Sequence, residues 1–248
     1  MRWPSPRSRL IRNEPPQSGL LTRDDAVGQS LSRGKRLEAR LDMVDRLSFT
    51  DEETALLTDA AFFERKARIS EKIRAQLEVT RQTLREEITH TVLPEMSDYD
   101  SASAQLVKGE HLESFPYQYL DCPKHFRGTE KRTFRTLFWW GHHVAWAWIL
   151  EGILMRQYKK RLVDRFHMVA GRDLELSLAP TLWEWKRGEG FTLPITHDRK
   201  AQIAAVVAER SFLKIVRFLP LGDPRVQSGA LAELSRDVFR AMLPIVTL

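Results

Sequence analysis

The chain has 248 residues, of which 42% are hydrophobic and 29% are charged. This composition matches ordinary globular domains and excludes a chain that is disordered throughout. Residues 1–42 hold nine Arg or Lys against five acids, so the net charge of +6 falls to +2 for residues 43–248. Nucleic-acid binding usually needs a clustered basic face, so the net positive charge is weak evidence for it, and we expect no nucleic-acid partner.

The N-terminal segment is rich in proline and arginine. Residues 1–22 carry four prolines and four arginines without apolar periodicity, which predicts disorder. We expect a basic leader over residues 1–42 and a single α+β domain over 43–248. Three alternatives stay open for the leader: a transit peptide, a phosphate-seeking arm, or an extension ahead of a true start at Met43.

Cysteine use and hydropathy indicate the compartment. Cys122 is the sole cysteine, so no intrachain disulfide forms, and the N-terminus lacks the pattern of a secretory signal. The most apolar stretch, Leu137 to Leu154, is interrupted by glycines, histidines and Glu151, and is too broken for a membrane span. We expect a cytoplasmic protein with no membrane span.

A helical region opens the predicted domain. Thr50 is followed three residues later by Glu53, the pattern of a capping box at a helix start. Apolar residues then recur at spacings of four or seven from Phe62 to Ile88. The pattern predicts one or two amphipathic helices over about 51–92, ended by Pro94.

After this helical region the sequence predicts a loop and then three short strands rich in aromatic residues. Met96 to Ser114 is polar and predicts a loop, whereas Pro116 to Cys122, Phe134 to Trp140 and Val144 to Leu150 have the composition of half-buried strands. Gly141 indicates a hairpin turn between the last two. In the last strand the larger side chains alternate with Ala145, Ala147 and Ile149, and we expect a helix to pack closely on the alanine side.

The remainder of the chain predicts helices and a second hairpin. We expect a helix over Ile153 to Val169, a hairpin of Leu174 to Trp185 with Phe191 to Ile195, and a helix from Arg199 to Phe218. A last helix should follow Ser228. The fold class is therefore α+β, with N-terminal amphipathic helices, a central antiparallel Trp-rich sheet of about four or five strands, and C-terminal helices.

One polar cluster is suited to catalysis. Asp121 and His125 flank Cys122 and Pro123, and Arg135 precedes the pair His142 and His143. Histidine and carboxylate exchange protons near neutral pH, and arginine orients anionic substrates. The candidate catalytic residues are thus His142, His143, Asp121 and Arg135. The chain has no recognised metal or nucleotide motif, and we expect no metal and no cofactor.

Two other readings of this region stay open. Cys122 beside His125 has the residue types of a thiol nucleophile and its base, but Pro123 follows directly and a third orienting group is missing, which favours a buried packing residue. The Trp-rich strands also suit a cavity for an apolar or planar ligand. Trp183 and Trp185, beside Lys186, are an alternative exposed binding edge. The candidate ligand-binding residues are Trp139, Trp140, Trp146, Trp148 and His125.

Residues 112–143 carry a weak family likeness. The stretches LESFPYQYLDCPKHF and FRTLFWWGHH resemble an uncharacterised bacterial protein family with no assigned function, in which a Leu-Asp-Tyr-Pro-like turn precedes Phe-Trp-Trp-Gly. Cys122 stands where the family has an aromatic residue. The resemblance implies no role for any residue.

The sequence leaves two leading hypotheses for function, besides a third in which an N-terminal arm binds nucleic acid or an acidic surface. The first is a non-catalytic binding or accessory protein with a Trp-rich pocket or partner surface, whose partner is a small apolar or planar ligand or another protein. The second is an enzyme of unrecognised class that uses a His/Asp/Arg site within residues 121–143.

Overall fold

The computed structural model describes residues 43, 46–93 and 103–248. The chain divides into two compact units, one ending at Phe62 and the other running from Phe63 to Leu248. The leader predicted at residues 1–42, its expected disorder, and part of the loop predicted from Met96 lie outside the described residues.

The first unit contains α2 (Asp51–Thr58), which begins as the sequence predicts. The Thr50 hydroxyl accepts a hydrogen bond from the Glu53 backbone N–H at 3.1 Å, and the Glu53 carboxylate accepts one from the Thr50 N–H at 2.8 Å. Two of the free N–H groups at the helix start are thereby paired.

Helix α3 (Ala60–Thr89) begins at the end of the first unit, and most of it belongs to the second. Its buried apolar residues recur at spacings of four and seven: Ile73, Leu77, Leu84 and Ile88. The other faces are charged and exposed, so this is one amphipathic helix whose apolar stripe packs on the sheet. The prediction of one or two helices between about 51 and 92 is confirmed, and there are two, α2 and α3.

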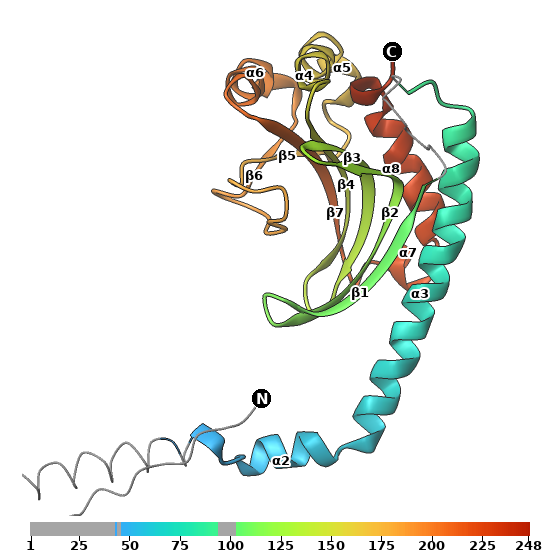
Figure 1. The fold of residues 1–248 in the computed structure, drawn as a ribbon, viewed down its shortest axis with the longest axis vertical. Coiled ribbons are helices and arrows are strands. Elements are labelled where there is room, and N and C mark those ends of the chain that lie inside the picture. The colour runs from blue at the N-terminus through green and yellow to red at the C-terminus, as the bar shows by residue number, and fades with distance from the viewer. Residues whose placement is uncertain (1–42, 44–45, 94–102) are drawn as a thin grey trace, which may run out of the picture. The chain divides into compact units, whose positions relative to one another are not determined.

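The second unit is built on a seven-stranded antiparallel sheet in the order β1-β2-β3-β4-β7-β5-β6 (Figure 1). Its strands are β1 (Gln105–Leu112), β2 (Phe115–Arg127), β3 (Glu130–Trp139), β4 (His143–Glu151), β5 (Glu175–Ser177), β6 (Thr192–Pro194) and β7 (Phe212–Pro220). The α+β class and antiparallel pairing are confirmed, but the predicted count of four or five strands is too low.

The two missed strands have different causes. Strand β1 lies in the segment predicted as a loop, because its polar sequence suits a sheet edge with few buried positions. Strand β7 lies where a helix was predicted to reach Phe218. It is the central strand between β4 and β5 and is buried on both faces, so its nearly continuous apolar run lacks the alternation that distinguishes a strand from a helix.

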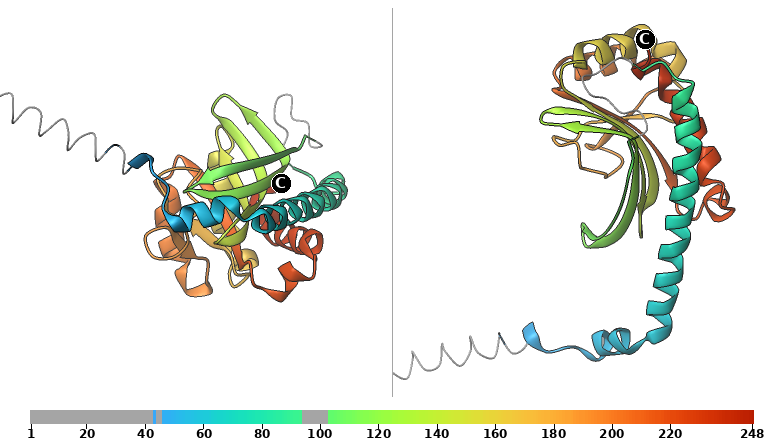
Figure 2. Two further views of the ribbon diagram at one scale, coloured as in Figure 1. Left: turned by 90° about the horizontal axis from the view of Figure 1, so that it is seen from below. Right: turned by 45° about the vertical axis from the view of Figure 1, so that its right-hand side comes forward.

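Helices α3 and α8 (Leu231–Val246) lie over one face of this curved sheet (Figures 1 and 2). We call that face the helix face and the opposite one the loop face. On the helix face the Trp146 indole N–H donates to the Ser235 hydroxyl of α8 at 2.7 Å. The expected helix therefore packs on the tryptophan side of β4, and the alanine side instead faces residues of the β5–β6 connection.

Further helices lie between the later strands or between β7 and α8. They are α4 (Met155–Asp164), α5 (Phe166–Val169), η1 (His197–Arg199), α6 (Lys200–Ala208) and α7 (Pro224–Gln227). The predicted helix over 153–169 is present as α4 and α5, whereas the one predicted from Arg199 ends at Ala208. Ser228 ends α7 and does not start α8, which begins at Leu231. No helix in the described ranges is long and apolar enough to span a bilayer.

Candidate functional site

An aromatic cavity of about 330 Å³ opens on the loop face of the sheet. Its walls come from the β1–β2–β3 side of the sheet and from residues 178–191, the connection between β5 and β6, which we call the Trp loop. Five aromatic residues, two leucines and one arginine line it: Tyr117, Tyr119, Phe126, Trp183, Trp185, Leu112, Leu137 and Arg135. We take it as the candidate site because apolar cavities with a few polar groups are typical of ligand sites.

Arg135 and Asp121 form a buried ion pair in this region. The two residues are directly paired across β3 and β2, and the guanidinium donates from Nε and Nη2 to the two carboxylate oxygens at 2.7 Å each. Arg135 is only 5% exposed and Asp121 is fully buried. Asp121 and Arg135, which the sequence analysis placed in one cluster, are therefore in contact. Both oxygens of the Asp121 carboxylate accept hydrogen bonds from the arginine.

Aromatic rings surround the Arg135 guanidinium. Its central carbon lies 3.6 Å from the Tyr119 ring centroid, 5.0 Å from that of Trp183 and 5.8 Å from that of Trp185. Ring faces carry partial negative charge and attract a guanidinium. Two of the three guanidinium nitrogens bind Asp121, and the Tyr119 hydroxyl is a further hydrogen-bond partner of Arg135.

The Trp loop is fastened to the sheet by Lys214 of β7. The Lys214 ammonium donates to the backbone carbonyls of Leu182, at 3.0 Å, and Glu184. It also lies 4.2 Å from the centroid of the Trp185 ring. A buried lysine on a central strand is therefore satisfied by loop carbonyls, and these contacts hold Trp183 and Trp185 over the sheet.

Burial changes the proton affinity of two groups under the Trp loop. Desolvation lowers the pKa of Lys214 to about 7, opposed by Glu184 and supported by the positive charge of Arg135. Desolvation, then His142 and Arg187, lowers the pKa of His143 to about 4, opposed by its hydrogen bond with the Trp185 backbone. Both side chains thus contact the Trp loop, and burial there makes the protonated, charged form of each less stable.

Contacts between separate connections link the two walls of the cavity. Lys186 of the Trp loop pairs with Glu113 of the β1–β2 turn at 2.6 Å, and the Phe126 and Trp183 rings meet edge to face with centroids 6.0 Å apart. Trp183 and Phe126 remain 42% and 38% exposed. These two rings therefore form the entrance, where an occupant gains contact area without disturbing the core.

The predicted histidines do not join Asp121 and Arg135. His142 is exposed at the β3–β4 turn, stacked on Trp139 with centroids 3.7 Å apart. His143 pairs with Trp139, four residues along β3 from Arg135, or about 13 Å at strand spacing. His125 pairs with Arg132, in register with Leu150 of the helix face, so it lies on the opposite face from Arg135.

The predicted tryptophans also occupy different environments. Trp146 and Trp148 are buried in the core between the sheet and α8, and Trp140 is partly buried in the turn after β3. Trp139 lies on the loop face, where its indole N–H donates to the Leu112 carbonyl at 3.0 Å. None of these four lines the aromatic cavity. Its indoles are Trp183 and Trp185, which the sequence offered as an alternative binding edge.

The tyrosines and Phe126 were missed by the sequence analysis. Tyr117 and Tyr119 stand two residues apart on β2 and therefore share the loop face, a spacing that the sequence does display. Phe126 follows the register shift of β2 between Asp121 and Lys124, which alternation cannot anticipate.

Cys122 has the surroundings of a packing residue. It is fully buried on the helix face, and burial raises the pKa of its thiol to about 12. Among the residues that the structure describes, no three or more His, Cys, Asp or Glu side chains are grouped in a way that could hold a metal ion.

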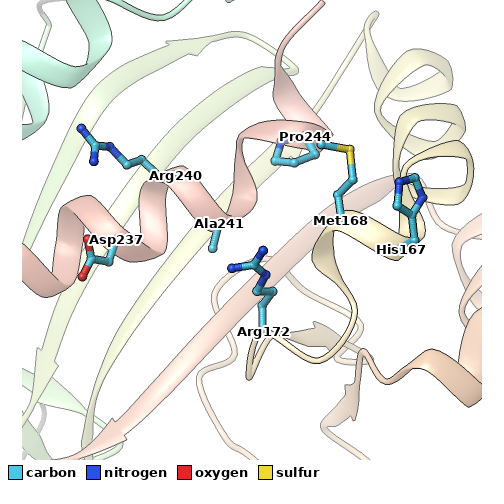
Figure 3. A pocket seen from close by; sticks show the side chains of 7 residues that line it. All are labelled: His167, Met168, Arg172, Asp237, Arg240, Ala241 and Pro244. Carbon is cyan, nitrogen blue, oxygen red and sulfur yellow. The ribbon is translucent and has the colours of Figure 1, made fainter.

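Two other hollows lie outside the aromatic cavity. One of about 630 Å³ lies between α5 and α8, with His167, Met168, Arg172 and Arg240 among its lining residues (Figure 3). The other, of about 270 Å³, includes Arg187, Arg217 and Arg225, each paired with an acid. In neither hollow do aromatic rings surround a buried ion pair, as they do in the aromatic cavity.

Comparisons with known proteins give no assignment: no family model, no curated protein and no solved structure matches this chain. The resemblance of residues 112–143 to an uncharacterised bacterial family stays a prediction.

Proposed function

We propose that this chain is a non-catalytic binding protein whose aromatic cavity takes a small, planar, mostly apolar ligand. The observation that carries the proposal is the convergence of five aromatic side chains around Arg135 in a cavity of about 330 Å³. Flat rings offer a large apolar area with few rotatable bonds, which favours stacking of a planar ligand.

The ion pair limits the polarity of this ligand. Asp121 balances the charge of Arg135, so the cavity has little net charge to attract a strongly charged molecule. Arg135 nevertheless lines the cavity and has five N–H groups, of which two bind Asp121. An acceptor on the ligand edge, such as a carbonyl or one carboxylate, would meet one of the others. We therefore propose a planar ring system with a single acceptor group.

The enzyme hypothesis has less support. The eight residues that line the cavity include no histidine, cysteine or carboxylate, and His142 and His143 stand at the far end of β3. A general acid or base must reach the reacting proton within hydrogen-bond distance. The proposed setting is the cytoplasm, which agrees with the single free thiol of Cys122.

Calorimetric titration with three planar probes tests the binding proposal: indole, 2-naphthol and 2-naphthoate. We expect 2-naphthoate and 2-naphthol to bind more tightly than indole, because both offer an oxygen acceptor to Arg135. Binding should show a negative heat-capacity change as apolar surface is buried.

Two phenylalanines provide a matched control. Phe126, which lines the cavity, and Phe115, which does not, are 38% and 42% exposed. Phe126→Ala and Trp183→Ala should each weaken binding roughly fivefold to tenfold through the lost ring contact, while Phe115→Ala should have little effect. If none of the probes binds, or if Phe115→Ala weakens binding as much as Phe126→Ala, the cavity is not the ligand site.

A further inference from the structure

Positive charge in the second unit is concentrated in one short segment. Residues 153–172, the connection that contains α4 and α5, hold six Arg or Lys against one acid. The rest of residues 43–248 holds 24 basic and 27 acidic residues and is slightly negative. The charge of this segment therefore exceeds that of the whole predicted domain, which is otherwise balanced.

Few of the cations in this segment are paired with an acid. In the segment only Lys160 pairs with a described carboxylate, Asp164. Arg161 donates to Gln157, Arg165 donates to the carbonyls of Pro244 and Thr247, and Lys159 donates to Ala208.

Two cations of this group, Arg161 and Arg165, act on one another. Burial lowers the pKa of Arg161, Tyr158 opposes this, and the positive charge of Arg165 lowers it further. Five positive side chains without a carboxylate destabilise the folded chain through self-repulsion. An anionic surface brought against the segment would relieve that repulsion.

The outer side of the segment combines charge with apolar groups. Exposed residues recur every three or four positions, as Ile153, Arg156, Gln157, Lys160, Asp164, His167 and Met168. Ile153 is 81% exposed and Met168 is 45% exposed, whereas the two aromatic residues of the segment, Tyr158 and Phe166, are buried. Stacking on nucleic-acid bases needs exposed rings, while a bilayer interface accepts exposed aliphatic groups flanked by cations.

A hollow beside the segment provides room for a headgroup. Figure 3 shows His167, Met168 and Arg172 on one side of it, and Asp237 and Arg240 of α8 on the other. Arg240 is already paired with Glu87. Arg172 is exposed and binds no described carboxylate, so its guanidinium is available to a phosphate oxygen.

We propose that α4, α5 and the adjoining hollow form a docking surface for a membrane rich in anionic lipids. The helices would lie along the bilayer interface, with Arg156, Lys160 and Arg172 against headgroup phosphates and Ile153 inserted between them. This peripheral association is independent of the aromatic cavity, which lies on the loop face of the sheet.

Sedimentation of the full chain with vesicles tests this surface. Vesicles with about a third phosphatidylserine should bind the protein, and pure phosphatidylcholine should bind it weakly. Each basic side chain near an anionic bilayer strengthens binding roughly fivefold, so Arg156→Gln with Arg172→Gln should weaken it tenfold or more. Ile153→Ser should reduce the binding that persists when salt screens the charges.

A charge-matched variant separates this site from general attraction. Lys72 and Arg74 are exposed on α3, and Lys72→Gln with Arg74→Gln removes the same charge away from α4 and α5. This control, which like all the variants keeps the basic residues 1–42, should bind within about twofold of the wild type. Absence of binding to the anionic vesicles, equal loss in the two double variants, or tighter binding to duplex DNA than to vesicles at the same salt would overturn the proposal.

Discussion

The guanidinium of Arg135 and the carboxylate of Asp121 meet through two hydrogen bonds of 2.7 Å, from directly opposed positions of β3 and β2. The Tyr119 ring lies against the same guanidinium at 3.6 Å. One arginine thus joins two strands, an aromatic ring and the cavity lining, which makes the pair the structural centre of the candidate site.

Removing one partner of this pair should cost more than removing both. Asp121→Ala leaves a buried uncompensated guanidinium, and we expect a loss of about 3–5 kcal/mol in the free energy of unfolding. Asp121→Leu combined with Arg135→Met should lose less than Asp121→Ala, because no buried charge is left. Urea denaturation of the single and double variants measures the coupling, and additive losses would mean that the pair is solvated.

Lys214 should make stability rise with pH above neutrality. Because its folded pKa is lowered to about 7 from 10.5, the unfolded chain binds more protons between these values. The free-energy penalty of burying the charged lysine is complete below about pH 7 and disappears as pH rises toward 10.5, by up to roughly 5 kcal/mol. Chemical denaturation from pH 7 to 10 should show this rise in the wild type and a smaller one in Lys214→Met. Parallel curves would contradict it.

His143 should weaken the fold in mild acid. Its pKa is lowered to about 4 from 6.5, so the unfolded chain binds more protons in that window. Stability should fall as pH drops from 6.5 to 4, by at most about 3 kcal/mol, and His143→Asn should flatten this dependence. His142→Asn, at an exposed turn position, is the control and should change stability by less than about 1 kcal/mol. Identical pH profiles in wild type and His143→Asn would refute the assignment.

Two tryptophans should differ sharply in their contribution to stability. Trp146 is 1% exposed and bonded to Ser235, so Trp146→Ala should cost about 3–5 kcal/mol through the cavity it leaves. Trp183 is 42% exposed, and Trp183→Ala should cost less than about 1 kcal/mol. Denaturation midpoints compare them directly, and similar losses would mean that the Trp loop is part of the stabilising core.

The elements that the sequence predicted are those with local signals. Thr50 and Glu53 specify a helix start over four residues, and the alternation in β4 assigns Trp146 and Trp148 to one face. β7 has neither signal, because a central strand is apolar on both sides and Lys214 interrupts it with a charge. Only the Leu182 and Glu184 carbonyls, more than 25 residues away, explain why a lysine is buried there.

Only part of the candidate site could be predicted from the sequence, again because some of its contacts have no local signal. Asp121 and Arg135 became neighbours through strand pairing of the expected kind. The aromatic wall, by contrast, depends on a loop that crosses the sheet and on the shifted register before Phe126, both of which are tertiary features. The sequence analysis chose Trp146 and Trp148 as ligand-binding residues because they are tryptophans on a predicted strand. Their indoles are instead buried in the core, since α8 covers that face of the sheet, and the residue type alone does not reveal which face a helix will cover.

The indole N–H signals of the seven tryptophans test the central claim most directly. Each can be assigned in a ¹H–¹⁵N spectrum by single Trp→Phe substitution and then followed during titration with 2-naphthoate. We predict saturable shifts of Trp183 and Trp185, which line the cavity, and unchanged signals for Trp146 and Trp148 in the core. Shifts confined to Trp139 and Trp140, or no saturable shift of Trp183 and Trp185, would contradict a ligand site under the Trp loop.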